Sequence, residues 1–564
     1  MQIVKRKIKQ ATATRKGKII FFSLLALIMF AIAGGLLYWQ THKKQIIREQ
    51  LESAIHGKSD GLYSIRYDSL DLDEASGYLS VKQLHLAYDS NKYLTLRDQD
   101  KTPAILLKIY VPEITVTGVK TPKALIDKEI EGTKLELKNP EIEIMYTGEG
   151  KDSSQNLPDR EIYEQLLGNL NLISIDTVII TGANIRTSNM KTHQTGFKFT
   201  NASVQLINVR IDSTANEDAS RLFFAKEVMA GCDTGYSLSA NGRYNYVMHG
   251  VALNSVTRMV TAKDFKLEPR LGEAAFVKSL PTQDDRFDFS IENIAIKNID
   301  FIRLGYDDII ADSVIIGSAS FKIYRDLTIP RDKKNRVGTY PQQAIDKIPI
   351  PIDVKTILLR NGYVEYKEMN AITKRIGKVI FNNVYTVISN MTNKKELVEK
   401  NNIMRADINC RFMDLAPFKV SWLFYLKNPN GRFDLEGNLG SLDAKRMTIL
   451  TEPMGPARLT DGTINSVYFK LAGNDYSMGG TVKMLYENLK VSLLEKDKDT
   501  KKLDKKGFMS FVANIIIKND NPSGKNKEIR VAEVTNPRNT NRSIFNLSWK
   551  TLFKGLKETV GIKK

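Results

Sequence analysis

The stretch "YSIRYDSLDLDEASGYLSVKQLHLAYDS", residues 63–90, decides the fold class. Apolar residues alternate with polar ones on both sides of the turn-forming "DEASG", which predicts a β-hairpin with one apolar face. The alternation changes phase between Tyr67 and Leu70, and again between Val81 and Leu84. We expect a β-bulge or a tight bend at each change, because such a break keeps the apolar side chains on one face.

A period of two continues along most of the chain beyond this hairpin. Apolar runs are separated by clusters of Gly, Asn, Asp and Pro, which is typical of strands joined by turns. The pattern predicts a mainly β protein. The strand candidates are 104–119, 132–147, 172–188, 197–212, 287–304, 308–326, 350–368, 480–495 and 511–518.

Three of these runs resemble one another. They are "ISIDTVIITGANI" (173–185), "FSIENIAIKNIDF" (289–301) and "IIADSVIIGSASF" (309–321), and each places a small or turn-forming residue inside an apolar run. The spacing between the copies is irregular, which argues against a strict solenoid. We therefore expect an array of meandering antiparallel strands with a recurrent strand–kink–strand unit.

Helical patterns are few. They cover residues 43–57, 159–170, the unusually apolar 415–428, and 543–561. The last has an apolar stripe at helical spacing, which fits either a terminal helix that packs against the sheet or a membrane- or partner-docking helix. Both alternatives stay open. The stripe contains Ile544, Leu547, Trp549, Leu552, Phe553 and Leu556.

Residues 19–39 carry no charge, and at ~1.5 Å per residue a helix of this length spans a bilayer core of ~30 Å. Seven basic residues precede it within 1–18, so the positive-inside rule predicts a cytoplasmic basic tail, a transmembrane signal anchor, and a body outside the cytoplasm. The alternative is a signal peptide cleaved after "AIA" at 31–33. The predicted anchor residues are Ile19, Phe22, Leu25, Leu27, Phe30, Leu37, Tyr38 and Trp39.

The composition fits a large folded protein, and the predicted location of its body argues against a nucleic-acid partner. The chain has 564 residues, too many for one ordinary compact domain, and 42% of them are hydrophobic. Its net charge of +19 suggests anionic partners, but a translocated body is separated from DNA and RNA. The two cysteines, Cys232 and Cys410, form no metal motif, and the sequence leaves their pairing open.

The sequence contains no recognisable catalytic motif. The five histidines are scattered, and HExxH, GxSxG, P-loop and GxGxxG patterns are absent. Asp434, Glu436 and Asp443 lack the regular ligand spacing of a calcium loop. We therefore predict no enzymatic activity, no catalytic residues, no metal and no cofactor.

The order of these features resembles the AsmA-like family of Gram-negative envelope proteins, which is related to bridge-like lipid transfer proteins. A short anchor precedes the first hairpin, "NPEIEI" (139–144) follows a strand, and "YVEY" (363–366) precedes a strand that begins at a glycine. A segment with recurrent "G-x-L" strands and a Pro-Met-Gly loop comes later. The resemblance is carried by residues 62–86, 106–144, 350–393 and 431–497.

This resemblance implies an elongated, twisted antiparallel sheet folded into an open groove lined with apolar side chains. It implies a periplasmic groove region (40–400), an AsmA-like C-terminal β domain (401–495), and a lysine-rich segment with a final strand and amphipathic helix (496–564). The implied function is non-enzymatic binding or conduction of phospholipid for outer-membrane homeostasis by a protein of the inner membrane. An envelope protein partner or a second copy of the chain is left open, and no groove residues are assigned.

Two alternatives compete with this hypothesis. The same alternation builds a closed sandwich or barrel with an ordinary packed core. A scaffold for outer-membrane protein biogenesis, with strand edges as docking sites, would also need no catalytic residues. For the 63–90 hairpin, we expect the apolar face to meet acyl chains rather than a packed core.

Overall fold

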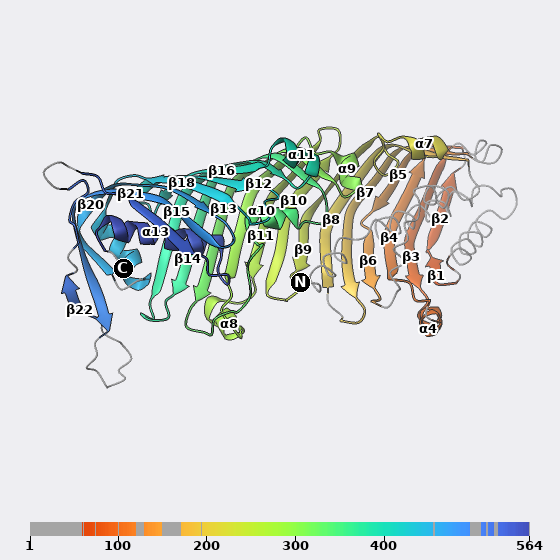
Figure 1. Ribbon diagram of the computed structural model, residues 1–564. Coiled ribbons are helices and arrows are strands. Elements are labelled where there is room, and N and C mark those ends of the chain that lie inside the picture. Colours follow the sequence, from red (N-terminus) through yellow and green to blue (C-terminus); the bar gives the residue numbers. More distant parts are fainter. Residues whose placement is uncertain are drawn as a thin grey trace. The chain divides into compact units, whose positions relative to one another are not determined.

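The computed structural model is mainly β. It divides into two compact units, residues 1–265 and 266–564, and strand β11 (Met259–Pro269) crosses the boundary (Figure 1). The residues that the structure describes are 59, 61–73, 75–99, 101–119, 129–148, 171–192, 195–454, 457–496, 509–514, 517–523 and 528–562.

The first unit is built on paired strands in which β7 runs parallel to β5 and β6, while the other described pairs are antiparallel. β5 and β6 both lie between β4 and β7, so together they occupy one strand position. Its elements are β1 (Tyr63–Arg66), β2 (Ser69–Asp73), β3 (Tyr78–Tyr88), α4 (Ser90–Asp98), β4 (Ile105–Thr117), β5 (Glu129–Lys138), β6 (Glu141–Tyr146), β7 (Leu172–Asn189), β8 (Thr195–Ile211), α7 (Ser213–Glu217), β9 (Glu227–Leu238) and β10 (Tyr244–Asn254).

In the second unit, β13 and β14 are parallel and the remaining described pairs are antiparallel. The strands are β12 (Arg286–Lys297), β13 (Ile309–Asp326), β14 (Ile352–Met369), β15 (Ile376–Thr392), β16 (Ile403–Phe412), β17 (Ala416–Tyr425), β18 (Phe433–Leu439), β19 (Leu442–Asp443), β20 (Ala457–Gly473), β21 (Ser477–Lys496), β22 (Met509–Asn514) and β23 (Ala532–Pro537). The helices are α8 (Glu273–Lys278), α9 (Phe301–Gly305), α10 (Pro341–Asp346), α11 (Lys395–Lys400), a 3-10 turn (Ala444–Met447), α12 (Thr448–Met454) and α13 (Ile544–Thr559).

The parallel pairs make the arrangement mixed, which corrects the prediction of a purely antiparallel sheet. The predicted domain border at residue 400 lies between β15 and β16, which pair with each other inside the second unit. The boundary between the two compact units lies within the predicted groove region.

The predicted breaks in the first hairpin are present. β1 and β2 pair with the two halves of β3 and are interrupted at residues 67–68. Opposite this interruption, Gln83 has a φ of 55°, which is the left-handed conformation. This conformation shifts the alternation by one residue, so that Val81 and Leu84 point to the same face.

The predicted kink is present in two of the three repeated runs, and the third run lies within the continuous strand β13. Asn293 and Asn298, the turn residues of one copy, have φ values of 53° each. In another copy Gly182 has a φ of 67°, and a Cβ there would lie 2.1 Å from the side-chain oxygen of Asn139. Glycine is therefore required at residue 182, where β7 passes the interruption between β5 and β6.

The predicted helix at 415–428 is wrong, because β17 occupies this stretch. Its Trp422 and Phe424 pair with Leu435 and Phe433 of β18 and are buried. A short, mostly apolar run does not distinguish a helix from a buried strand, and here the segment packs against neighbouring strands as β17.

Two predicted strands are also shorter than expected. The 287–304 run ends as a strand at Lys297, and α9 then begins at Phe301 with the Asp300 side chain accepting from Arg303 N. The 132–147 run is two strands, interrupted at Asn139 and Pro140.

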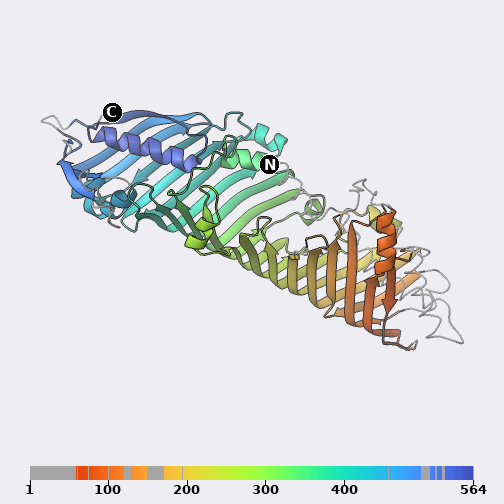
Figure 2. The same ribbon diagram turned by 90° about the horizontal axis from the view of Figure 1, so that it is seen from below.

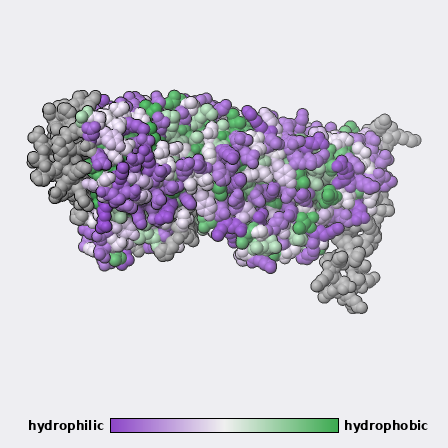
Figure 3. Space-filling model, turned by 180° about the vertical axis from the view of Figure 1, so that it is seen from behind, coloured by the Kyte–Doolittle hydropathy of each residue, from purple (hydrophilic) through white to green (hydrophobic). Residues whose placement is uncertain are grey.

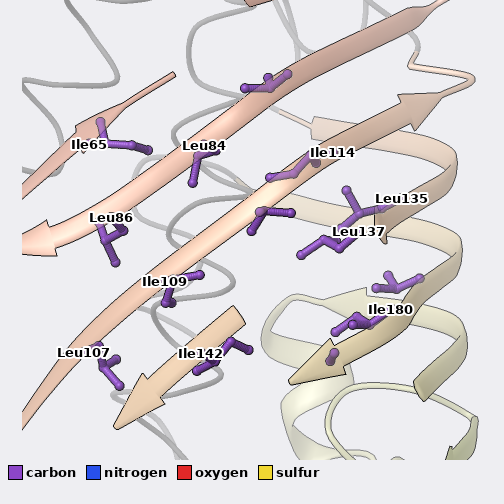
Figure 4. Packing of buried hydrophobic residues seen from close by; sticks show 14 of the residues in the cluster. Ile65, Leu84, Leu86, Leu107, Ile109, Ile114, Leu135, Leu137, Ile142 and Ile180 are labelled. Atoms are coloured by element: carbon purple, nitrogen blue, oxygen red, sulfur yellow. The ribbon is translucent and has the colours of Figure 1, made fainter. Parts of the chain in front are cut away.

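The apolar face of the first hairpin lies inside a packed hydrophobic cluster. Val81, Leu84 and Leu86 are each 0% exposed. Leucine and isoleucine side chains from neighbouring strands pack beside them, as Figure 4 shows. The expectation that this face meets acyl chains is therefore wrong, and for this hairpin the packed-core alternative holds.

The predicted anchor (19–39) and the predicted helices at 43–57 and 159–170 lie outside the described residues. Within the described part of the chain, no helix combines the length and the hydropathy needed to cross a membrane.

Candidate functional site: a half-buried apolar sheet face

Strands β12–β15 carry their large apolar side chains on one face. Phe289, Phe321 and Val364 are cross-strand neighbours, and the row continues through Phe381 of β15 to Phe412 of β16. We call this surface the apolar face. It consists of Phe287, Phe289, Ile291, Ile294 and Ile296 of β12, Val314, Ile316, Phe321 and Ile323 of β13, Ile357, Leu359 and Val364 of β14, and Val379, Phe381 and Ile388 of β15.

All of these named side chains are half-buried, although most of the residues lie in the middle of long strands. Val384 of β15, which pairs with Gly362 on the same face, is buried. The aromatic rings contact one another: Phe321 stacks on Phe287 with centroids 6.0 Å apart and meets Phe289 edge-on at 5.8 Å. Residues of this type in a sandwich interior are usually fully buried. The apolar face is thus only partly covered.

The opposite face of the same strands is mostly polar. It includes Asp288, Ser290, Ser320, Lys322 and Tyr363, interrupted by an apolar row around Ile315 and Leu358. A hollow of about 150 Å³ lies among its serines, near Glu292 and Asn361. Hydrophilic side chains also predominate in the rear view of Figure 3, where apolar ones show as separate spots.

Glu365, an acidic residue of the polar face, has two hydrogen-bond donors beside it. Tyr363 donates to Glu365 at 2.5 Å, and Lys378 lies 3.3 Å from the same carboxylate. Burial opposes ionisation, but these two hydrogen bonds hold the pKa of Glu365 below its usual value. Tyr363, Glu365 and Lys378 thus form a local polar network on this face.

Further along the unit, the same sheet surface is covered. α13 lies across the C-terminal strands (Figure 2), and a Cβ at its Gly555 would be only 2.4 Å from Val482 of β21. Beneath it, Trp422, Phe433 and Phe469 are buried. We call this region the covered end.

The structure separates the predicted stripe of α13 into two parts. Ile544 and Leu547 are buried against the sheet, as the packing alternative predicts, and Leu552 and Leu556 are half-buried beside them. Trp549 and Phe553 are instead exposed, at 44% and 43%, with their rings stacked 6.0 Å apart.

Sequence reasoning missed Phe545, which belongs with Trp549 and Phe553 at a spacing of four. It is 68% exposed, and its ring meets that of Trp422 at 6.1 Å. On the other flank of α13, Lys554 donates to the Thr535 carbonyl of β23 at 2.9 Å. The aromatic flank therefore faces away from β23, toward β17 and the strands before it.

A strap, defined as residues 327–351 between the parallel strands β13 and β14, is fixed by a buried ion pair. Arg538 pairs with Asp475, and the Arg538 guanidinium lies 4.2 Å from the Tyr340 ring centroid. Asp475 also accepts from Gly338 N at 3.2 Å and from Gln343 Nε2 at 2.6 Å. Burial raises the pKa of Tyr340 to about 12.

Cys232 and Cys410 are both free thiols. Burial raises the pKa of Cys410 to about 11 and also raises that of Cys232, so both are protonated at neutral pH. Among the residues that the structure describes, no group of three or more His, Cys, Asp or Glu side chains gathers to hold a metal ion.

No protein-family model matches the chain, and no curated protein is significantly similar to it.

Proposed function

We propose that the chain is a non-enzymatic, membrane-anchored protein that binds or conducts phospholipid along the apolar face. The observation that carries the proposal is the half-buried state of the named side chains of this face, on strands whose opposite face is mostly polar. A sheet with one accessible apolar face is a surface for apolar ligands.

The energetics suit acyl chains. Exposing a lipid chain to water costs ~0.8 kcal/mol per methylene, so two chains of a phospholipid amount to tens of kcal/mol. Contact with the phenylalanine, isoleucine, leucine and valine side chains of the apolar face offsets part of that cost. Neither a nucleophile nor a cofactor is needed for this task.

The proposed location rests on the sequence. The uncharged segment 19–39 after a basic tail supports a single-pass anchor in the inner membrane, with the body in the periplasm. The resemblance to the AsmA-like family supports the same location and a role in outer-membrane homeostasis.

The test compares two adjacent residues of β13 that point to opposite faces. The full chain, purified in detergent, carries Phe321→Asp or the matched control Ser320→Asp, and bound phospholipid is measured by native mass spectrometry. We expect phospholipid on the wild type and the control, and at least a tenfold loss in Phe321→Asp, because a charge on the apolar face opposes acyl contact.

A lipid-free wild type would refute the proposal. If the lipid-free chain instead retains an envelope protein through an interface unaffected by Phe321→Asp, the scaffold alternative is favoured. Thermal unfolding of both variants shows whether the aspartate at position 321 acts on binding or on folding.

A further inference from the structure

Helix α13 turns its largest apolar rings away from the sheet that it covers. The side chains that it buries are Ile544, Leu547, Ser548, Thr551, Gly555 and Thr559, most of which are small. Phe545, Trp549 and Phe553 are exposed instead. A helix on a sheet ordinarily buries its bulkiest apolar stripe against that sheet. Since exposed apolar patches mark interaction sites, the outer side of α13 is a candidate for one.

The exposed rings form one row that ends at a lysine. Phe545, Trp549, Phe553 and Lys557 follow at a spacing of four residues, so they lie along one side of the helix. The Trp549 and Phe553 rings stack, and Lys557 Nζ lies 5.4 Å from the centroid of the Phe553 ring. The row therefore combines an apolar length with a positive charge at one end.

This row has the length of one lipid chain. From Phe545 to Lys557 the helix rises ~18 Å, at ~1.5 Å per residue. Two leaflets share the ~30 Å hydrocarbon core of a bilayer, so an acyl chain extends over ~15 Å. A chain that lies along the rings brings its headgroup to Lys557, and the charge of this lysine complements an anionic headgroup.

The row is connected to the apolar face through β17. The rings of Phe418 and Phe381 lie 6.0 Å apart, between β17 and the apolar face. Trp422, on the same side of β17 as Phe418, meets the Phe545 ring of α13. Val420 lies between these two β17 residues on that side and is half-buried. Apolar contacts thus continue from the apolar face to α13.

We infer that the exposed row of α13 binds an anionic phospholipid, with an acyl chain along Phe545, Trp549 and Phe553 and the headgroup at Lys557. Contact with the chain removes the exposed rings from water, and the sheet does not do so. The ammonium group attracts the anionic headgroup as a point charge. The inference rests on the proposed function and adds a second lipid-binding surface and a charge preference.

The experiment uses Trp549 as the reporter. The full chain in dodecyl maltoside receives phosphatidylglycerol or phosphatidylcholine with dibrominated acyl chains, which quench tryptophan on contact. The Trp549→Phe variant is the reference, because the fluorescence that it lacks is that of Trp549. We expect both lipids to quench this difference signal, and phosphatidylglycerol to do so at an about threefold lower concentration, the effect of one exposed ion pair.

Two lysine variants test the charge at the end of the row. Lys557→Gln should abolish the difference between the two lipids. The matched control is Lys483→Gln, since Lys483 Nζ likewise lies over an aromatic ring, 5.7 Å from the centroid of Tyr468. Lys483 points to the opposite face of β21 from Val482, which α13 contacts. This control should keep the difference, and both variants should melt like the wild type.

The outcomes separate the two proposals. If Trp549 is not quenched while native mass spectrometry finds phospholipid that Phe321→Asp removes, the inference fails and the proposed function stands. If no phospholipid binds, the proposed function itself fails. If Lys557→Gln keeps the difference between the lipids, Lys557 is not a headgroup site and the inference is overturned.

Two further results would assign the row to another occupant. Quenching that occurs in lipid vesicles but not in detergent would indicate a membrane surface. A dimer in native mass spectrometry that Trp549→Asp dissociates would indicate a second copy of the chain. Either result overturns the inference.

Discussion

The half-buried apolar face of β12–β15 and the covered end of the same unit are built from similar residues. Phe321 and Phe381 in the first are as apolar as Phe433 and Phe469 in the second. The covered end differs because α13 lies on it and Tyr340 of the strap packs edge-on against Phe433 at 5.4 Å. Coverage, rather than composition, therefore distinguishes the two regions.

The largest expected effect contrasts one aromatic residue from each region. Trp422→Ala removes a buried side chain and should destabilise the covered end by about 4 kcal/mol. Phe321→Ala, in the half-buried region, should cost only about 1 kcal/mol, because less area leaves water when this residue folds. Denaturant unfolding of the full chain measures both, and equal costs would show that the two regions are equally packed.

The buried ion pair that fixes the strap should be nearly as sensitive. Arg538→Met leaves Asp475 buried without its cation, for an expected loss of about 3 kcal/mol. Adding Asp475→Asn to this variant should restore part of the loss, because it removes the unpaired charge. A double-mutant cycle measures the coupling, and a value near zero would mean that the pair does not hold the strap.

Packing of α13 on the sheet can be tested at a glycine. Gly555→Leu places side-chain atoms into Val482 and should destabilise the covered end by about 2 kcal/mol. The control is Gly272→Ala, where an added Cβ meets no atom within 4 Å. If both variants melt like the wild type, α13 does not rest on β21.

The smallest effect concerns Glu368 near the end of β14, which accepts a hydrogen bond from Tyr366 at 2.5 Å. Burial raises the folded-state pKa of Glu368 above its unfolded value, so this group reduces stability as pH rises through that interval. Glu368→Gln should therefore stabilise the chain by about 1 kcal/mol at pH 7 and leave it unchanged near pH 3. If the stability difference between Glu368→Gln and the wild type is largest at low pH, the expected pH dependence is contradicted.

The local features of the fold could be predicted from the sequence. The phase changes in the first hairpin and the asparagines in the repeated runs mark real kinks, because left-handed turns favour these residues and interrupt the alternation. The 415–428 segment was not predictable in this way, since its apolar run fits a buried strand as well as a helix.

The alternation of residues within a strand does not predict whether its apolar face is exposed or covered. Hairpin 63–90 and β12–β15 have the same alternation, yet one is packed and the other is half-buried. The difference depends on the tertiary neighbours of each face and not on its own alternation.

The most direct test of the central claim is photo-crosslinking in cells. A benzoylphenylalanine in place of Phe321, and separately in place of Ser320, samples the two faces of β13 at adjacent positions. Lipid binding on the apolar face predicts phospholipid adducts at position 321 and few or none at position 320, read by mass spectrometry of the purified chain. Equal labelling at both positions, or only protein adducts at position 321, would contradict it.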